Sequence, residues 1–178
     1  MTNAQLIALK AAILADPNLT AQVSAGATGA IAEYLRGAST FIVWRSSTAA
    51  QDIYNAITWA NLTPTDVPDS TAVWTNRSLA CQGKQFNVQT LLQGRDRISS
   101  DKPNVRAGLQ DGLTNVPSGA AGATVSAGWT TVRLAMQRPA SVFEKIFATG
   151  AGTQATPGSL VLEGGPQDYD VVQALTQV

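Results

Sequence analysis

The sequence contains no histidine and a single cysteine, Cys81. Without histidine the chain lacks the commonest general base and the commonest metal ligand. Cys81 cannot form an intrachain disulfide, and no activating cation stands beside it, so we expect it in a core. We therefore predict that the protein is not an enzyme, and that it has no catalytic, metal-binding or cofactor-binding residues and takes no cofactor.

Charged residues are also scarce. They make up 13% of the chain, about half of the ~25% that is typical. Charged residues are depleted at the cores of subunit interfaces, so a weakly charged surface indicates an assembly component. The 12 basic and 12 acidic residues cancel, which disfavours strong nonspecific binding to nucleic acid. No apolar run reaches the roughly 18 residues of a membrane span, and the N-terminus lacks a basic signal-peptide region, so we expect no membrane association.

Apolar residues recur at helical spacing through most of the first 148 positions. Asp16-Pro17 and Gly37 are typical helix ends, and Thr48 with Gln51 fits a capping box. The apolar run at 41–44 fits either a short strand or a buried linker. Residues 61–76 are rich in Pro, Asp and Thr and predict a loop. The expected helices are 3–15, a short one near Leu19, 28–35, 50–57, 77–93, one from about Pro103 to Val116, 124–137 and 142–147.

These helices and their short connections predict an all-α fold, a small helical bundle over residues 1–148. We expect this bundle to be one domain with one core. The residues expected in its interior are Leu9, Ile13, Ile53, Ile57, Leu91, Leu109, Leu113, Trp129, Val132, Phe143 and Phe147.

Residues 149–178 differ from the rest in being rich in Gly and Thr and poor in large side chains. A segment with little core of its own does not offset the entropy of ordering, so we expect an extended C-terminal arm that orders against a neighbouring subunit. A disordered tail is the alternative. Residues 160–162 would add a short strand to a partner's sheet, and 167–175 would form a terminal helix. Deletion of the arm is expected to leave the domain folded.

Two groups of residues are candidate contact sites. Trp74 lies in a polar stretch, where it is either an interface anchor or folds back on its own helices. The basic residues near position 100 are interleaved with aspartates, which favours a self-paired loop over a contact with DNA phosphates or an acidic subunit. The candidate interface residues are Trp74, Leu160, Val161, Leu162, Tyr169, Val171 and Val172, and the candidate channel or partner contacts are Arg95, Arg97, Lys102 and Arg106.

A family resemblance is carried by the stretches 6–17 (LIALKAAILADP), 44–45 (WR), 52–57 (DIYNAI), 86–92 (FNVQTLL), 104–109 (NVRAGL), 136–138 (MQR), 143–153 (FEKIFATGAGT) and 162–164 (LEG). Together they resemble a protein encoded in the head-to-tail (neck) gene region of many tailed bacteriophages. The similarity covers most of the chain except the loop at 61–76, and its most specific part is C-terminal, at 143–153 and 162–164.

The resemblance implies a virion structural protein, a head-to-tail adaptor that docks on the portal and continues the DNA channel. It implies a homo-oligomeric ring, of about twelve copies by analogy with portals. The implied partners are the portal, tail or nozzle proteins and, nonspecifically, packaged DNA. The protein would be made in the bacterial cytoplasm and reside in the virion. The alternatives are a capsid-decoration or tail-completion protein and, from another class, a small helical regulatory or chaperone-like binding protein.

Overall fold

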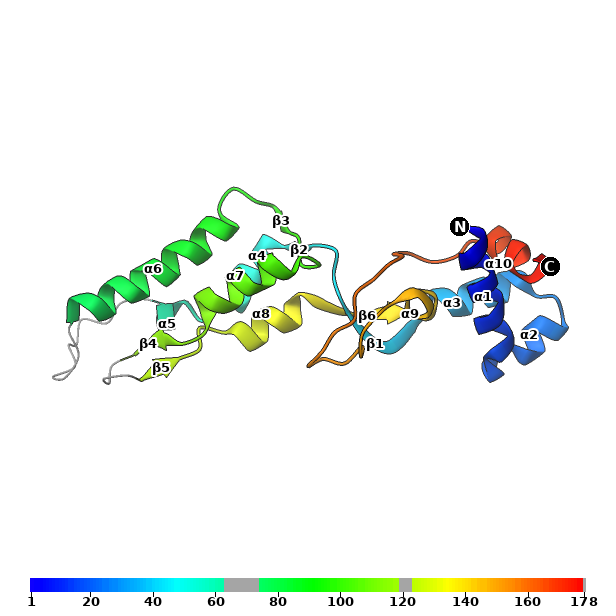
Figure 1. Cartoon of the computed structure of the whole chain (residues 1–178), viewed down its shortest axis with the longest axis horizontal. Helices are drawn as coiled ribbons and strands as arrows, with labels where there is room; N and C mark the ends of the chain where they lie inside the picture. Colours follow the sequence, from blue (N-terminus) through cyan, green and yellow to red (C-terminus); the bar gives the residue numbers. More distant parts are fainter. Residues whose placement is uncertain (63–73, 119–122, 178) are drawn as a thin grey trace. The chain divides into compact units, whose positions relative to one another are not determined.

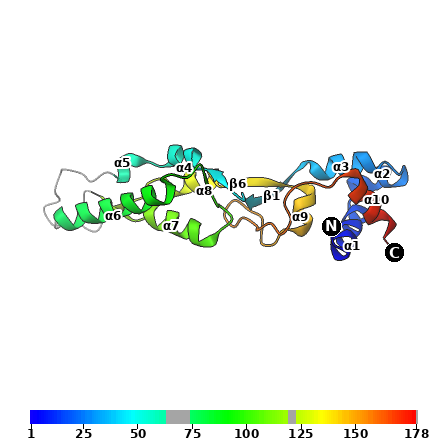
Figure 2. The same ribbon diagram turned by 90° about the horizontal axis from the view of Figure 1, so that it is seen from above.

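The computed structural model describes residues 1–62, 74–118 and 123–177, with the side chains of 74–78 excepted. The chain divides into two compact units (Figures 1 and 2). Unit 1 combines the two ends of the chain, Met1–Trp44 and Arg138–Val178, and unit 2 is the continuous middle, Arg45–Gln137. This division differs from the expected one, in which residues 1–148 form one domain followed by an arm.

Unit 1 consists of short helices and one two-stranded sheet in which β1 pairs with β6. Its elements are α1 (Asn3–Ala15), the 3-10 helix η1 (Pro17–Leu19), α2 (Thr20–Ser24), α3 (Thr28–Arg36), β1 (Ala38–Trp44), β6 (Gln137–Ser141), α9 (Val142–Phe147) and α10 (Asp168–Thr176).

Helix α1 has the bounds that the sequence predicts. Its first turn is closed by a capping box, in which the Thr2 hydroxyl accepts from the Gln5 N–H and the Gln5 side chain accepts from the Thr2 N–H. The helix stops at Asp16 because Pro17 disfavours helical geometry at the residue before it. Its inner face joins α3, α9 and α10 in one hydrophobic cluster of Leu6, Leu9, Ile13, Leu19, Ile31, Ala32, Leu35, Phe143, Val171 and Ala174.

Unit 2 is built around α6, which packs along α7 (Figures 1 and 2). Gly112 of α7 permits this close approach, because a Cβ there would collide with the Val88 side chain of α6. Two small antiparallel sheets flank the helices, with Thr48 opposite Ile98 in one and Val116 opposite Val125 in the other. The elements are β2 (Thr48–Ala49), α4 (Ala50–Ala56), α5 (Trp59–Leu62), α6 (Trp74–Leu92), β3 (Arg97–Ile98), α7 (Pro103–Leu113), β4 (Val116–Pro117), β5 (Thr124–Val125) and α8 (Trp129–Ala135).

The all-α prediction is wrong. Helices predominate, but the described residues also form three two-stranded sheets, so the fold is mixed α and β. The apolar run at 41–44 belongs to strand β1 rather than to a linker. The helix expected at 124–137 is shorter, because Thr124–Val125 and Gln137–Ser141 are strands on either side of α8. Pro139 lies within β6; a two-stranded sheet has only edge strands, where proline is tolerated.

The capping box expected at Thr48 and Gln51 is also absent. Thr48 is a buried strand residue whose hydroxyl lies 2.6 Å from that of Ser100. The residue before α4 is Ala49, which makes no side-chain cap. The Thr48 hydroxyl therefore joins β2 to the segment after β3 instead of starting a helix.

Residues 149–160 do not extend away from the chain but lie against β1. Ile42 donates its N–H to the Gly152 carbonyl and accepts from the Gly158 N–H, both at 2.8 Å. A Cβ at Gly152 or Gly158 would collide with the Phe41 ring, so the glycines make room for an aromatic side chain. The short strand expected at 160–162 is absent; isolated pairing occurs instead at Gly158 and Ser159.

The terminal helix expected at 167–175 is present as α10. It packs on α1 and α3 and buries Val171 and Ala174 in the core of unit 1. An extended arm without a core of its own is therefore not what the structure contains. Deletion of residues 149–178 was expected to leave the domain folded. The structure gives no basis for this expectation, because the deletion would remove α10 and expose the core of unit 1.

The expected interior residues fall into two cores rather than one. Leu9, Ile13 and Phe143 are buried in unit 1. Leu91, Trp129 and Phe147 are half-buried. The remaining ones, all buried in unit 2, are Ile53, Ile57, Leu109, Leu113 and Val132.

Replacement of Phe143 by Ala tests the core of unit 1. Phe143 is 3% exposed and meets the Phe147 ring edge-on, with ring centroids 5.2 Å apart. We expect the free energy of unfolding to fall by about 3–5 kcal/mol, measured by urea denaturation. Val172→Ala on the outer side of α10 is the control and should change it by about 0.5 kcal/mol or less. Equal losses for the two variants would contradict this core.

Candidate functional site

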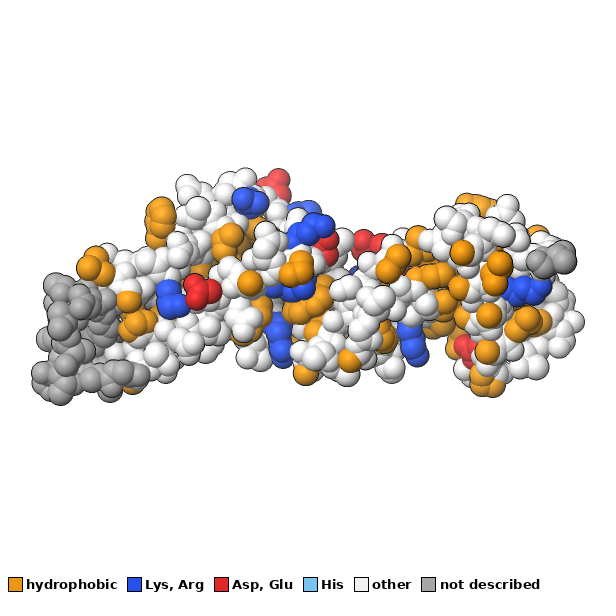
Figure 3. Space-filling model, viewed as in Figure 1, with side chains coloured by type: hydrophobic (Ala, Val, Ile, Leu, Met, Phe, Trp, Pro, Cys, Tyr) orange, Lys and Arg blue, Asp and Glu red, His pale blue; other side chains and the backbone are white. Residues whose placement is uncertain are grey.

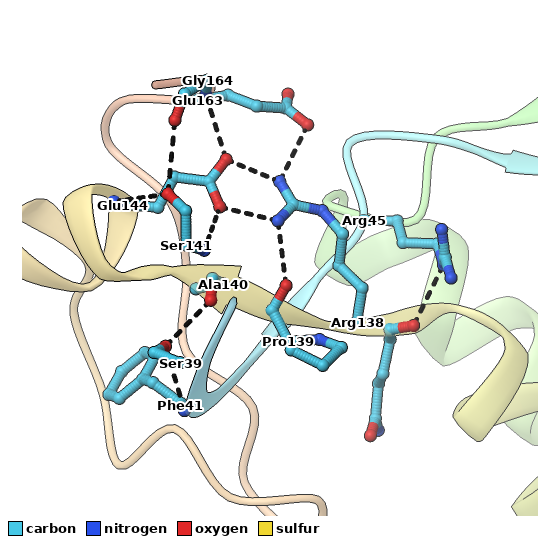
Figure 4. A network of polar contacts seen from close by, with 11 residues as sticks. Ser39, Phe41, Arg45, Arg138, Pro139, Ala140, Ser141, Glu144, Glu163 and Gly164 are labelled. Carbon is cyan, nitrogen blue, oxygen red and sulfur yellow. Dashed lines mark hydrogen bonds and ion pairs between the residues drawn. The ribbon is translucent and has the colours of Figure 1, made fainter. Parts of the chain in front are cut away.

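The most connected polar cluster described in unit 1 lies at the start of α9 (Figure 4). The Ser141 hydroxyl accepts from the Glu144 N–H at 3.0 Å, and the Glu144 carboxylate accepts from the Ser141 N–H at 2.8 Å. This capping box satisfies two backbone donors and turns the carboxylate back toward β6.

Arg138 of β6 meets this carboxylate with both ends of its guanidinium. Its two Nη atoms lie 2.6 and 2.8 Å from the Glu144 carboxylate oxygens, a bidentate ion pair. The same guanidinium reaches Glu163 at 3.1 Å. The Gly164 N–H donates to Glu144 at 3.0 Å, and the Ser141 hydroxyl donates to the Gly164 carbonyl at 3.3 Å. We call Arg138, Ser141, Glu144, Glu163 and Gly164 the clasp, because they tie residues 163–164 to β6 and α9.

The clasp keeps Glu144 ionised. Burial of the side chain, which is 4% exposed, raises its pKa. The hydrogen bonds from Arg138 and from the Gly164 and Ser141 N–H groups, with the Arg138 charge, outweigh that effect and lower the pKa of Glu144 to about 2. The bond to Glu144 in turn raises the pKa of Arg138. A carboxyl group of this kind is a poor general acid or base near neutral pH, because it does not exchange its proton there.

A cavity of about 380 Å³ opens beside the clasp. Arg36 lies in its wall and donates to the Pro166 carbonyl at 3.1 Å, a further tie to the C-terminal segment. The polar groups of the clasp already bind one another, so the arrangement fastens the chain rather than presenting reactive groups. The lining residues are Arg36, Ala38, Arg138, Pro139, Ser141, Glu144, Gly164 and Gly165.

Sequence reasoning missed the clasp. One signal was available, because Ser141 and Glu144 have the spacing of a capping box. The partners Arg138 and Glu163 carry no such local signal, since their contact spans 25 positions of the chain.

Unit 2 has an uncharged cavity of about 380 Å³ between α4, α5 and the end of α6. Tyr54 and Trp59 form one wall, with ring centroids 4.6 Å apart, and the Trp59 indole donates to the Tyr54 carbonyl at 2.9 Å. Gln89, Leu92 and Gln93 complete the lining. A neighbouring cavity of about 310 Å³ shares Tyr54 and Leu92 and adds Arg95 and Asp96. The first lining contains no Ser, Cys, Lys or carboxylate side chain.

The predicted basic residues lie in unit 2, and three of the four bind their own chain. Arg97 donates to the Ser47 hydroxyl at 2.7 Å, and Lys102 pairs with Asp101 at 2.9 Å. Arg106 donates to the Ser100 carbonyl at 2.8 Å; burial lowers its pKa, and the Asp101 charge opposes that shift. The fourth, Arg95, lines the smaller cavity. These contacts favour the self-paired alternative, and a contact with DNA or a partner stays a prediction.

The candidate interface residues divide by exposure. Val171 is buried in the core of unit 1, and Leu162 packs against that core. Leu160 is half-buried. Val161, Tyr169 and Val172 are exposed and remain candidates. The Trp74 side chain lies outside the described residues.

Other sequence expectations can be compared with the described part of the chain. Cys81 is buried, and its thiol donates to the Pro117 carbonyl at 3.3 Å, as expected of a core residue. Within that part, no three side chains of the metal-ligating types gather closely enough to hold a metal ion. None of its helices is both long and apolar enough to cross a membrane.

Comparison with known proteins gives no neighbour. No protein-family model matches the chain, and neither a curated protein nor a solved structure matches it significantly.

Replacement of Glu144 by Gln tests the clasp. The amide cannot form the bidentate ion pair, and Arg138 keeps only the exposed Glu163 as an anionic partner in the clasp. We expect the free energy of unfolding to fall by about 3 kcal/mol, measured by urea denaturation. The control is Glu163→Gln, whose side chain is 49% exposed and whose loss should cost about 1 kcal/mol or less. A loss at Glu144 no larger than at Glu163 would show that the clasp contributes little.

The clasp also predicts a pH dependence. The pKa of Glu144 falls from 4.5 to about 2 on folding, so its contribution is complete above about pH 4.5 and is lost as the pH falls toward 2. Asp16, whose pKa is lowered mainly by the Asn18 N–H, adds to the same acid sensitivity and is present in both the wild type and Glu144→Gln. Urea denaturation between pH 2 and 7 should show that the free energy of unfolding falls more steeply in acid for the wild type than for Glu144→Gln. Parallel curves for wild type and Glu144→Gln would contradict the lowered pKa.

Proposed function

We propose that this chain is a structural subunit of a tailed-bacteriophage virion, a head-to-tail adaptor that docks on the portal and continues the DNA channel. The observation that carries the proposal is the resemblance at 143–153 and 162–164. These residues include Glu144 and Glu163 of the clasp and Gly152 beside Phe41. The most specific part of the resemblance thus coincides with the contacts that fasten the C-terminal segment in unit 1.

The surface supports an assembly role. Large apolar side chains are exposed on α1, α6 and α10 (Figure 3), and an apolar surface of this kind is suited to protein partners. They include Ile7, Leu14, Leu79, Phe86, Tyr169 and Val172. The net charge of zero adds no long-range repulsion between copies. A homo-oligomeric ring remains part of the proposal, with about twelve copies by analogy with portals.

The polar sites favour a structural role over a catalytic one. The Glu144 carboxylate binds Arg138 and two backbone N–H groups, and its low pKa suits an ion pair better than proton transfer. The Tyr54 and Trp59 cavity has an amide and apolar lining. Both arrangements suit binding and shape rather than bond breaking.

Cryo-electron microscopy of virions from a phage that encodes this chain tests the proposal. The adaptor proposal expects density for both units in a ring at the neck, between portal and tail. Density on the capsid lattice or at the distal end of the tail would instead support the decoration or tail-completion alternative. Absence of the chain from purified virions by mass spectrometry would contradict a virion role and favour the regulatory alternative.

A further inference from the structure

Helix α1 is apolar on nearly every side. Apart from Asn3, Gln5 and Lys10, each of its residues is apolar. Leu6, Leu9 and Ile13 bury one face in unit 1, yet the opposite side is exposed. A helix that is hydrophobic all round is normally buried all round, so the outer face of α1 has the composition of a contact surface.

The outer face follows the spacing of a helix–helix seam. Ala4, Ile7, Ala11 and Leu14 are separated by three, four and three positions, which is the a and d pattern of a heptad repeat. Ile7 is 50% exposed and Leu14 is 57% exposed. Both alanines are exposed as well and allow another helix to approach closely. We call these four residues the outer seam.

No charged residue belongs to the outer seam. Lys10, the one charged residue of α1, donates to the Gln177 carbonyl beyond the end of α10. The helix α10, which packs on α1, adds exposed Tyr169 and Val172. Its Asp170 carboxylate accepts from the Gln167 N–H as a cap, while Asp168 at its first position is exposed. An uncharged seam has no group to pair with nucleic acid phosphates or anionic lipid headgroups, and its apolar side chains suit the apolar face of another protein helix.

The outer seam is complementary to itself in one orientation. When two copies of α1 run antiparallel about a two-fold axis, a positions face d positions. Ala4 then faces Leu14 of the second copy, and Ile7 faces Ala11, so that each large residue meets a small one. A parallel pair would place Ile7 against Ile7 and Ala11 against Ala11, so that large residues meet large ones and small residues meet small ones. We propose that α1 pairs antiparallel with α1 of a second copy of this chain.

This contact goes beyond the adaptor proposal and does not rest on it. A two-fold contact joins a pair and cannot by itself close a cyclic ring, so the pairing concerns the free protein or the meeting of two rings. The 13 residues of α1 give about 20 Å of helix, short for the roughly 800 Å² per partner of a standard interface. We therefore expect a weak dimer with a Kd of about 10 µM.

Sedimentation equilibrium of the full chain tests the pairing, from about 1 µM to about 1 mM protein. The wild type should pass from monomer to dimer. Ala11→Glu and Ile7→Lys should each remain monomeric at ten times the wild-type Kd, because each places a charge in the seam. Both positions are exposed and both new residues favour helix, so the thermal melting of each variant should match that of the wild type. Leu79→Glu on α6, at a residue 63% exposed, is the matched control and should dimerise normally.

Mixing the two variants tests the orientation. In an antiparallel pair the glutamate introduced by Ala11→Glu faces the lysine introduced by Ile7→Lys, so the equimolar mixture should regain dimers that neither variant forms alone. A mixture that stays monomeric would overturn the antiparallel register. A wild type that is monomeric at 1 mM, dimers of Ala11→Glu as stable as wild type, or loss of dimers in Leu79→Glu alone would each overturn the role of α1. Virion imaging is independent of all these outcomes.

Discussion

The ion pair between Arg138 and Glu144 is the constraint on which unit 1 depends. Its two partners lie close in sequence, at the strand and helix that begin the C-terminal part of the unit. The pair also holds the C-terminal segment, because Glu163 binds Arg138 and the Gly164 N–H donates to Glu144. The clasp thereby holds the chain about four residues before α10 begins, which limits where that helix can lie. Val171 and Ala174 then complete the core that α1 and α3 begin.

The sequence predicted the elements whose causes are local. Helix α1, with a capping box at its start and Pro17 after its end, and α10, with an apolar stripe, were placed to within one residue. Helix α7 begins at Pro103 as expected but ends at Leu113, three residues before the expected Val116. A strand at 41–44 was only one of two alternatives, and β6 was missed, because the two strands lie almost a hundred positions apart and neither shows a strand-like alternation that distinguishes it.

The C-terminal segment was misjudged for a different reason. Its glycines were taken as a sign that it lacks a core, whereas Gly152 and Gly158 are small because the Phe41 ring lies against them. Glu163, the one charged residue of the stretch 149–166, is bound by Arg138. Composition describes the side chains of a segment but not the surface on which the segment packs. The candidate site was missed for the same reason, because Arg138 and Glu144 form a site only through contacts that the fold creates.

The central claim is that residues 149–177 belong to the fold of unit 1 in the free protein. Hydrogen–deuterium exchange of the full chain, resolved to α1 and α10, tests it most directly. Buried helices with satisfied backbone hydrogen bonds exchange only when the structure opens. The account predicts that the Val171 and Ala174 amides of α10 and the Leu9 and Ile13 amides of α1 are protected to a similar extent, and that the Gly164 amide, bound to Glu144, is slowed as well. Exchange of α10 and Gly164 at the rate of an unfolded peptide, beside a protected α1, would contradict it.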